Sequence, residues 1–209
     1  MKLNNIIKYP IEFNIENEYD LLIINDGDQL DKFKINSNMI IVGIIPDNRL
    51  DLYTPFPAKA LRSGVPDFGG KCNELNDYLS KELIPNLKEK YKIKRLIYGG
   101  YSLGGLAAIY SLFNIDAFDI VFSICGSFWY PGFVDYVKNN KIITNAKVYL
   151  LNGELEGAKH NNLLEKAPIS AHEVHDCLKI KADAISIFDE YGHHENIEQR
   201  FNTIISLIK

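Results

Sequence analysis

The sequence predicts an α/β protein with a mostly parallel central sheet and helices on both faces. Two observations lead to this fold class. Short runs of apolar residues alternate along the chain with longer segments whose apolar residues follow helical spacing. The short runs are continuous rather than alternating in polarity, as expected of strands that are buried on both sides of a sheet. Strands separated by helices favour parallel pairing through right-handed crossovers.

Six strands and four helices are expected. The apolar runs predict strands at 21–24, 39–45, 95–98, 120–125, 148–151 and 184–188, and helical spacing predicts helices at 72–91, 106–113, 163–179 and 197–208. Pro85 should kink or restart the first helix, because proline lacks the N–H that an α-helix needs. Ligands of such sheets bind at the carboxyl ends of the strands, so the residues just after each strand are the candidates for a site.

The composition is that of one soluble globular domain spanning residues 1–209. Of the 209 residues, 46% are hydrophobic and 24% are charged, which excludes a disordered or disulfide-scaffold protein. The net charge of −4 argues against a nucleic-acid partner, because a phosphate backbone selects a basic surface. The cysteines at 72, 125 and 177 form no CxxC pair and are expected to be reduced.

Neither a signal peptide nor a membrane span is expected. Residues 1–10 have no long apolar core. The uncharged stretch 96–115 is long enough to cross a bilayer, but glycines interrupt it at two points, and a buried strand, turn and helix fit it better. We therefore predict a cytoplasmic protein without a membrane partner.

A Gly-x-Ser-x-Gly motif at 100–104 follows the strand at 95–98 and opens the next helix. A serine on such a tight turn is forced outward over the edge of the sheet, which is the setting of a nucleophile elbow, and the glycines leave room for the turn. Ser102 is therefore the candidate nucleophile, and the N–H of Leu103 at the helix N-terminus is a candidate oxyanion donor. The alternative is a glycine-rich helix start with an incidental serine.

A serine hydroxyl needs a base, which in an α/β hydrolase follows the last strand, with an acid before it in the chain. His193 and His194 come just after the strand at 184–188. We favour His193, because Gly192 permits a sharp turn into the site, and keep His194 as the alternative. The other three histidines lie in or beside a polar helix and are expected to have no catalytic role: His160, His172 and His175.

The acid is expected after the strand at 148–151, where Glu154 and Glu156 lie. We favour Glu156, three residues after a glycine on a loop that can reach back toward the histidine, and keep Glu154 as the alternative. A carboxylate there would hold the imidazole in one tautomer and stabilise its charged form. A second oxyanion donor is expected in the turn after the strand at 21–24, from the backbone N–H of Gly27 or Asp28.

These residues together resemble the esterase family of α/β hydrolases that includes esterase D-like enzymes, feruloyl esterases, enterochelin esterases and mycolyltransferases. The resemblance covers about residues 21–201 and rests on the segments LLIINDGD, GGYSLGGLAAIYSLF, SICGSFWY, NGELE and YGHH. It implies an α/β-hydrolase fold with Ser102 as nucleophile, His193 as base and Glu156 as orienting acid. We expect no cofactor and no metal.

The resemblance also extends to Asn48-Arg49 and Tyr53-Thr54-Pro55. Arg49, Tyr53 and Trp129 are the candidate pocket residues; an arginine there would favour an anionic or catechol-bearing acyl group. Core packing is an equal alternative for Trp129. The segment 47–71 is the longest free connection, so we expect it to shape an open pocket without a separate lid domain.

The predicted reaction is hydrolysis of a small-molecule carboxylic ester through an acyl-enzyme on Ser102. Two alternatives stand beside it: an acyltransferase that uses the same three residues, and an inactive hydrolase-fold protein that binds a ligand. Siderophore lactones, sugar esters, simple acyl esters and thioesters all remain open as substrates, and any oligomeric state is compatible with the sequence.

Overall fold

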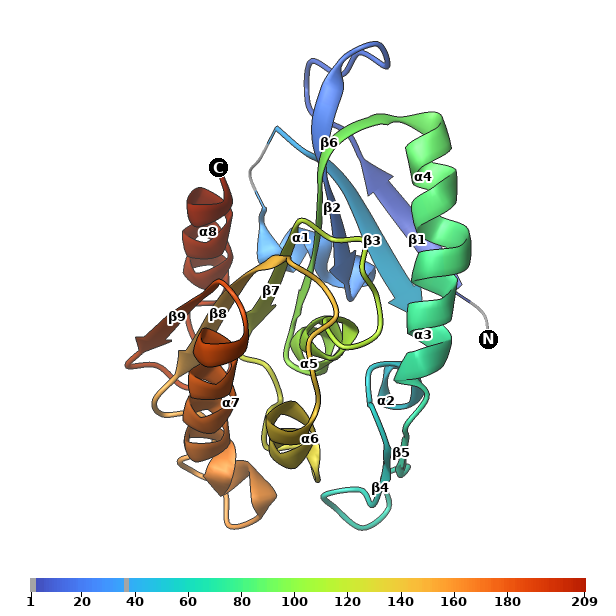
Figure 1. Ribbon diagram of the computed structural model, residues 1–209. Coiled ribbons are helices and arrows are strands. Elements are labelled where there is room, and N and C mark those ends of the chain that lie inside the picture. Colours follow the sequence, from blue (N-terminus) through green and yellow to red (C-terminus); the bar gives the residue numbers. More distant parts are fainter. Residues whose placement is uncertain (1–2, 36–37) are drawn as a thin grey trace.

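The computed structural model describes residues 3–35 and 38–209, and it confirms the predicted fold class (Figure 1). Within the described residues, seven strands form a central sheet in the order β1-β3-β2-β6-β7-β8-β9. All neighbouring strands are parallel except β1 and β3. The strands are Leu3–Lys8 (β1), Glu18–Asn25 (β2), Ile40–Pro46 (β3), Lys92–Tyr101 (β6), Ile120–Ile124 (β7), Lys147–Gly153 (β8) and Ala184–Asp189 (β9).

Helices cover both faces of this sheet (Figure 1). One face carries Leu30–Phe33 (α1) and Ile197–Ile208 (α8), and the other carries Cys72–Tyr78 (α3), Ile84–Lys90 (α4), Leu103–Ser111 (α5), Phe133–Asn139 (α6) and Ala167–Lys181 (α7). The smaller elements are the turns Gly27–Gln29 (η1), Leu79–Leu83 (η2) and Leu163–Lys166 (η3), the helix Arg49–Leu52 (α2), and the hairpin of Pro57–Ala58 (β4) with Phe68–Gly69 (β5).

The continuous apolar runs are explained by two buried clusters, one on each face of the sheet. In β2, Leu21 and Ile23 belong to the cluster under α3 to α7, whereas Leu22 and Ile24 belong to the cluster under α1 and α8. All four side chains are fully buried. Successive side chains of a strand point to opposite faces, so a strand covered on both sides needs apolar residues at every position.

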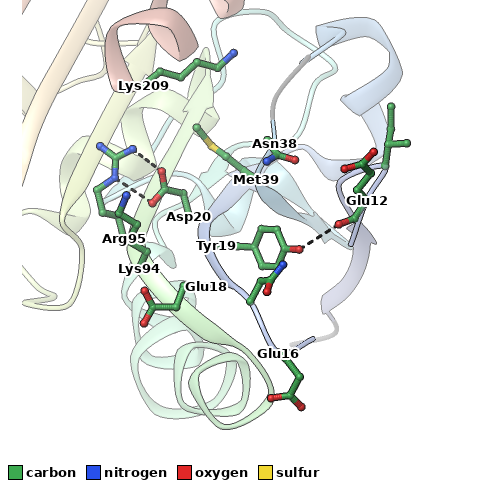
Figure 2. Close-up of a pocket in the computed structure, with 12 residues that line it drawn as sticks. Glu12, Glu16, Glu18, Tyr19, Asp20, Asn38, Met39, Lys94, Arg95 and Lys209 are labelled. Carbon is green, nitrogen blue, oxygen red and sulfur yellow. Dashed lines mark hydrogen bonds and ion pairs between the residues drawn. The ribbon is translucent and has the colours of Figure 1, made fainter. Parts of the chain in front are cut away.

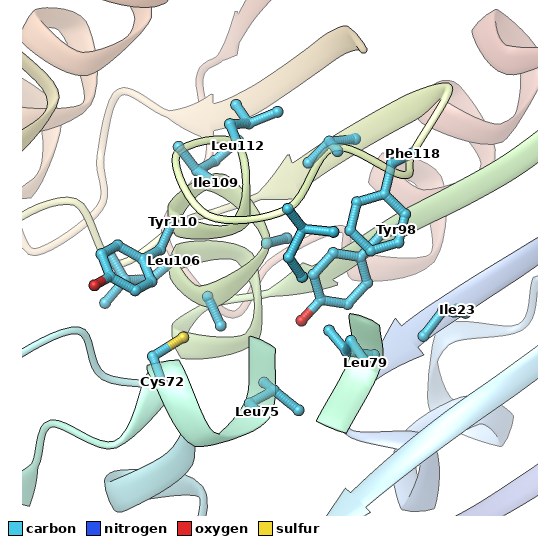
Figure 3. Packing of buried hydrophobic residues seen from close by; sticks show 14 of the residues in the cluster. Ile23, Cys72, Leu75, Leu79, Tyr98, Leu106, Ile109, Tyr110, Leu112 and Phe118 are labelled. Atoms are coloured by element: carbon cyan, nitrogen blue, oxygen red, sulfur yellow. The ribbon is translucent and has the colours of Figure 1, made fainter. Parts of the chain in front are cut away.

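The larger cluster joins α3 to α5, the helix that follows the Gly-x-Ser-x-Gly motif. Cys72 and Leu75 of α3 pack against the side of α5 that carries Leu106 and Tyr110 (Figure 3). All of these side chains are buried, and Cys72 is a free thiol. The packing anchors α5, and with it the turn at the end of β6.

The expected break at Pro85 is confirmed. The segment begins as α3, widens into the π-helical turn η2 and restarts as α4, with Pro85 in the first turn of α4. The helix does not end there, because Leu83 keeps right-handed helical angles and the N–H of Ile84 bonds to the carbonyl of Leu79. The wider π-helical turn shifts the hydrogen-bond pattern just before Pro85, which accommodates a residue that has no N–H.

Several elements were not predicted from the sequence: the short α1, α2, β4 and β5, and two longer ones. One is β1, the antiparallel edge strand, whose side chains are half-buried or exposed and therefore give no apolar run. The other is α6, a short helix of seven residues after the turn at 127–132. Within the described residues, no helix has both the length and the apolar character that crossing a membrane would require.

Replacement of Phe201 by alanine is expected to lower the free energy of unfolding by about 3–5 kcal/mol. The ring is fully buried on α8 and stacks on Phe33 with centroids 4.3 Å apart, so its removal leaves a cavity under the sheet. Urea-induced unfolding measures the change. Leu207→Ala on the same helix is the control, because this side chain is 41% exposed and should change stability by only about 0.5 kcal/mol. Equal losses of unfolding free energy in Phe201→Ala and Leu207→Ala would contradict the buried stacking of Phe201 on Phe33.

Candidate active site

Ser102 lies on a sharp turn between β6 and α5. Its backbone has φ 59° and ψ −123°, a conformation that non-glycine residues rarely adopt and that is typical of a nucleophile elbow. The turn requires glycine at position 100, because the backbone passes close to Gly104. A Cβ atom at Gly100 would lie only 2.6 Å from the carbonyl carbon of Gly104, which is too close for any side chain. Leu103 is the first residue of α5, so its N–H has no acceptor within the helix.

Ser102, His193 and Glu156 form a hydrogen-bonded chain. The Nε2 atom of His193 lies 3.0 Å from Oγ of Ser102, and its Nδ1 atom lies 2.5 Å from Oε2 of Glu156. Because a carboxylate can only accept, Nδ1 carries the proton of the neutral ring, and Nε2 is free to accept the serine proton. The structure thus brings together the three residues that the sequence singled out, in the arrangement of a catalytic triad.

Glu156 is held in place by the end of β8. It is 3% exposed, and its Oε1 atom accepts hydrogen bonds from the backbone N–H of Gly153 at 2.7 Å and from Nδ2 of Asn152 at 3.1 Å. The alternative acid, Glu154, points elsewhere and contacts His172 at 3.0 Å. The geometry therefore favours Glu156 over Glu154 as the partner of His193.

His194, the alternative base, lines the same pocket but contacts Tyr101. Its Nδ1 atom lies 3.1 Å from the hydroxyl of Tyr101, and this hydroxyl also donates to the backbone carbonyl of His193. Burial, together with the neighbouring His193, lowers the pKa of His194. His193 is thus the histidine that reaches Ser102.

Arg200 braces the loop that carries His193. Its side chain is 2% exposed and forms a two-point ion pair with Asp189, with N–O distances of 2.7 and 2.5 Å. It also donates to the carbonyl of Gly192 at 3.0 Å and contacts Sγ of Cys125 at 2.8 Å. Burial, the largest single effect, lowers the pKa of Arg200, but the hydrogen bonds to Asp189 together with the electrostatic effects of Cys125, Asp189 and Glu156 leave the pKa raised. This role of Arg200 was not predicted from the sequence.

A pocket of about 340 Å³ opens over Ser102. Its apolar wall includes Leu61, Phe68 and the half-buried Trp129, and its polar residues include Arg62 and His160. The segment 47–71 contributes to this wall as expected. This segment is not sufficient to form the pocket, because the connection after β8 supplies a second wall through residues such as Gly157 and Leu164.

Two of the three expected pocket residues line the pocket, Arg49 and Trp129. The assignment of Tyr53 to the pocket is corrected by the structure. Tyr53 is fully buried, and its hydroxyl accepts the backbone N–H of Asp26 at 2.9 Å, so it supports the turn after β2 from inside the core. Arg49 is held by Asp26 through two hydrogen bonds of 3.0 and 2.9 Å, which neutralise much of its charge.

The residues expected to supply the second oxyanion donor, Gly27 and Asp28, are not among the described residues that line the pocket. Gly27 lies against β3, where a Cβ atom would come within 2.4 Å of the backbone of Gly43. The structure therefore does not bring these N–H groups to the pocket wall, and their role stays a prediction.

One group of potential metal ligands overlaps the site. Ligand atoms of Cys125, Glu156 and His193 lie within 4.8 Å of one another. Burial raises the pKa of the Cys125 thiol, and the guanidinium of Arg200 already occupies the space beside its sulfur. A cation there would displace the proton of the thiol and face a fixed positive charge, so this arrangement fits a hydrogen-bonded triad better than a metal centre.

A second hollow lies at the opposite end of the sheet, beside the first residues of β2 and β6 (Figure 2). It measures about 1080 Å³ and is bordered by carboxylates and basic groups, among them Glu18 and Lys94. Asp20 and Arg95 are paired there by a two-point ion pair. None of its described lining residues is a serine, cysteine or histidine, so it has no hydroxyl or thiol paired with an imidazole, as Ser102 is.

The fold and the site define a protein of the α/β-hydrolase fold whose serine, histidine and carboxylate are arranged as in serine hydrolases. Among curated proteins, the uncharacterized protein YbbA of Bacillus subtilis (strain 168) is 29% identical over 175 residues, which cover 78% of this chain and 70% of YbbA. No family model matches the chain.

Solved structures share the fold. The IroE-like serine hydrolase from Shewanella oneidensis superposes with a TM-score of 0.78 at 20% identity, covering 95% of this chain and 73% of that one. The siderophore hydrolase EstB from Aspergillus nidulans has a TM-score of 0.68 at 17% identity, covering 99% of this chain and 89% of that one. The resemblance to the esterase family of α/β hydrolases that was inferred from the sequence is thereby confirmed at the level of the fold.

Replacement of Arg200 by leucine is expected to lower the free energy of unfolding by about 3 kcal/mol, because it leaves the partly buried Asp189 without its partner. Chemical denaturation measures the loss. Arg62→Leu is the matched control and should change stability by about 0.5 kcal/mol, since Arg62 is exposed. The double variant Arg200→Leu/Asp189→Leu should recover part of the loss. If the double variant is no more stable than Arg200→Leu, the ion pair with Asp189 is not the main contribution of Arg200 to stability.

Proposed function

We propose that this protein is a serine hydrolase that cleaves a carboxylic ester through an acyl-enzyme on Ser102. The single observation that carries the proposal is the chain from Oγ of Ser102 through the ring of His193 to Glu156, with contacts of 3.0 and 2.5 Å. The strained backbone at Ser102 and the pocket above it add support, because they expose the hydroxyl to a bound substrate.

The proposed reaction has two halves. His193 takes the proton of Ser102 as Oγ attacks the ester carbonyl, and the N–H of Leu103 stabilises the oxyanion. His193, now charged beside Glu156, protonates the leaving alcohol, and an acyl-enzyme remains. Water then attacks with His193 again as the base, and the acid is released as Ser102 regains its proton.

The pocket supports an ester whose acyl or alcohol part has an apolar or aromatic portion. Phe68 and Trp129 lie with ring centroids 6.4 Å apart on its wall, and Arg62 and His160 offer hydrogen-bond donors or a positive charge beside them. The names of the similar structures, a serine hydrolase and a siderophore hydrolase, add siderophore esters to the simple acyl esters as classes to assay.

Replacement of Ser102 by alanine is expected to lower kcat/KM for p-nitrophenyl acetate by about 10⁴-fold or more, because no other group forms the acyl-enzyme. Labelling by a fluorophosphonate probe should be lost in the same variant. Ser206→Ala, a change at an exposed serine of α8, is the control and should keep both activity and labelling.

Unchanged hydrolysis by Ser102→Ala would refute the proposal. A wild-type protein that neither hydrolyses esters nor reacts with the probe would instead favour a ligand-binding protein. Transfer of the acyl group to an added alcohol in preference to water would assign the same site to an acyltransferase.

Replacement of Glu156 by glutamine is expected to lower kcat roughly 10³- to 10⁴-fold, because an amide no longer holds the required tautomer of His193 or stabilises its charged form. Steady-state kinetics on the same ester measures the effect. Glu154→Gln is the matched control two residues away and should leave kcat within about twofold of wild type, since Glu154 contacts His172 rather than His193. A larger loss of kcat in Glu154→Gln than in Glu156→Gln would instead assign the role of the acid to Glu154.

A further inference from the structure

A second buried histidine lies behind the proposed triad. His175 of α7 is fully buried. From the sequence, this residue is expected to have no catalytic role. Its Nε2 atom lies 3.0 Å from Oδ1 of Asn152, and its Nδ1 atom lies 2.8 Å from Oγ of Ser186 on β9. Asn152 in turn contacts Glu156, so His175 is connected to the carboxylate through one side chain.

The direction of every hydrogen bond in this chain follows from the carboxylate. Glu156 can only accept, so the group of Asn152 that faces it is the amide nitrogen, which leaves the amide oxygen to face His175. That oxygen needs a donor, so Nε2 of His175 carries the proton. The unprotonated Nδ1 atom then accepts the hydroxyl proton of Ser186.

We propose that His175 is a positioning residue for the triad acid: it fixes the side-chain amide of Asn152 so that the amide nitrogen, and not the oxygen, faces Oε1 of Glu156. This leaves Oε2 of Glu156 for His193. The inference rests on the proposed function, because it assigns His175 a part in the same site.

The surroundings keep His175 in its neutral form. Burial, followed by the nearby His172, lowers its pKa to about 3. The charged and titratable groups acting on it lie on its own helix, where Lys179 opposes and Asp176 favours its protonation. The contacts from the other elements packed against it are uncharged: Phe128, Asn152, Ser186 and Phe188. A single tautomer therefore persists at neutral pH.

The first test replaces His175 by phenylalanine, which keeps a ring against Phe188 but has no donor for Asn152. We expect kcat to fall about tenfold with KM within about twofold, because the geometry of the base changes and the pocket does not. The acid limb of the pH profile of kcat/KM should also move to higher pH. In this variant the carboxylate of Glu156 either loses the hydrogen bond from Asn152 or faces the amide oxygen of Asn152, and both changes favour protonation at the site. His175→Gln, whose amide can donate, should recover most of kcat.

The matched control is His172, one turn earlier on the same helix and stacked on the same Phe188 with centroids 3.8 Å apart. It contacts Glu154 and not Asn152, so His172→Phe should leave kcat and the pH profile unchanged. Rates are normalised to the number of serines titrated by a fluorophosphonate probe, so that a loss of folded protein is not counted as a loss of kcat.

A double-mutant cycle separates positioning from general structural damage. If His175 acts through Asn152, then His175→Phe should have little further effect on kcat in an Asn152→Ala background. Full additivity of the two changes would overturn the proposal, as would a wild-type kcat and pH profile in His175→Phe. An inactive wild-type protein would refute the proposed function itself, which is a distinct result.

Proton linkage supplies a readout that needs no activity. Because the pKa of His175 falls from its ordinary value of 6.5 to about 3 on folding, the unfolded chain binds about one more proton in this window. This contribution to stability is complete above pH 6.5 and is lost as the pH falls toward 3. His175→Gln should remove it, whereas His172→Gln should retain most of it, because burial is the main cause of the lowered pKa. An unchanged pH dependence in His175→Gln would mean that His175 takes up its proton at the same pH in the folded protein as in the unfolded chain, which contradicts a buried ring held neutral in one tautomer.

Discussion

The close packing at the junction of β6 and α5 is the constraint on which the rest of the site depends. Gly100 and Gly104 approach each other too closely for a side chain, and Ser102 between them takes a backbone conformation that costs free energy. The buried contacts of α5 with α3 and with the sheet hold the two elements in this arrangement. The cost of the strained turn is offset by core packing some distance away from the serine.

The parallel sheet then brings the partners of Ser102 to the same edge. The strands β6, β7, β8 and β9 are consecutive neighbours, so the loops after β8 and β9 emerge beside the elbow. Glu156 comes from the first of these loops and His193 from the second. Three residues up to 91 positions apart in the chain are thereby within hydrogen-bond distance.

Each partner of the serine is held by a second residue from a helix that covers one face of the sheet. Arg200 of α8 binds the loop of His193 from one side, and His175 of α7 reaches Glu156 through Asn152 from the other. Both are polar groups in apolar surroundings, where an unmade hydrogen bond is costly. Their complete pairing explains how a loop-borne histidine and carboxylate can keep fixed positions.

The features that could be predicted from the sequence are those that depend on residues close together in the chain. The strand runs, the break at Pro85, and the setting of Ser102 between a strand and a helix all follow from local spacing, because burial and backbone geometry repeat within a few residues. The loops holding the acid and the base were predictable from their places after strands, although the sequence left two residues open for each role. The contacts that separate Glu156 from Glu154 and His193 from His194, the burial of Tyr53, and the parts taken by Arg200 and His175 required the folded structure. They arise where strands and helices distant in the chain are packed side by side, and no local pattern records which side chains will meet there.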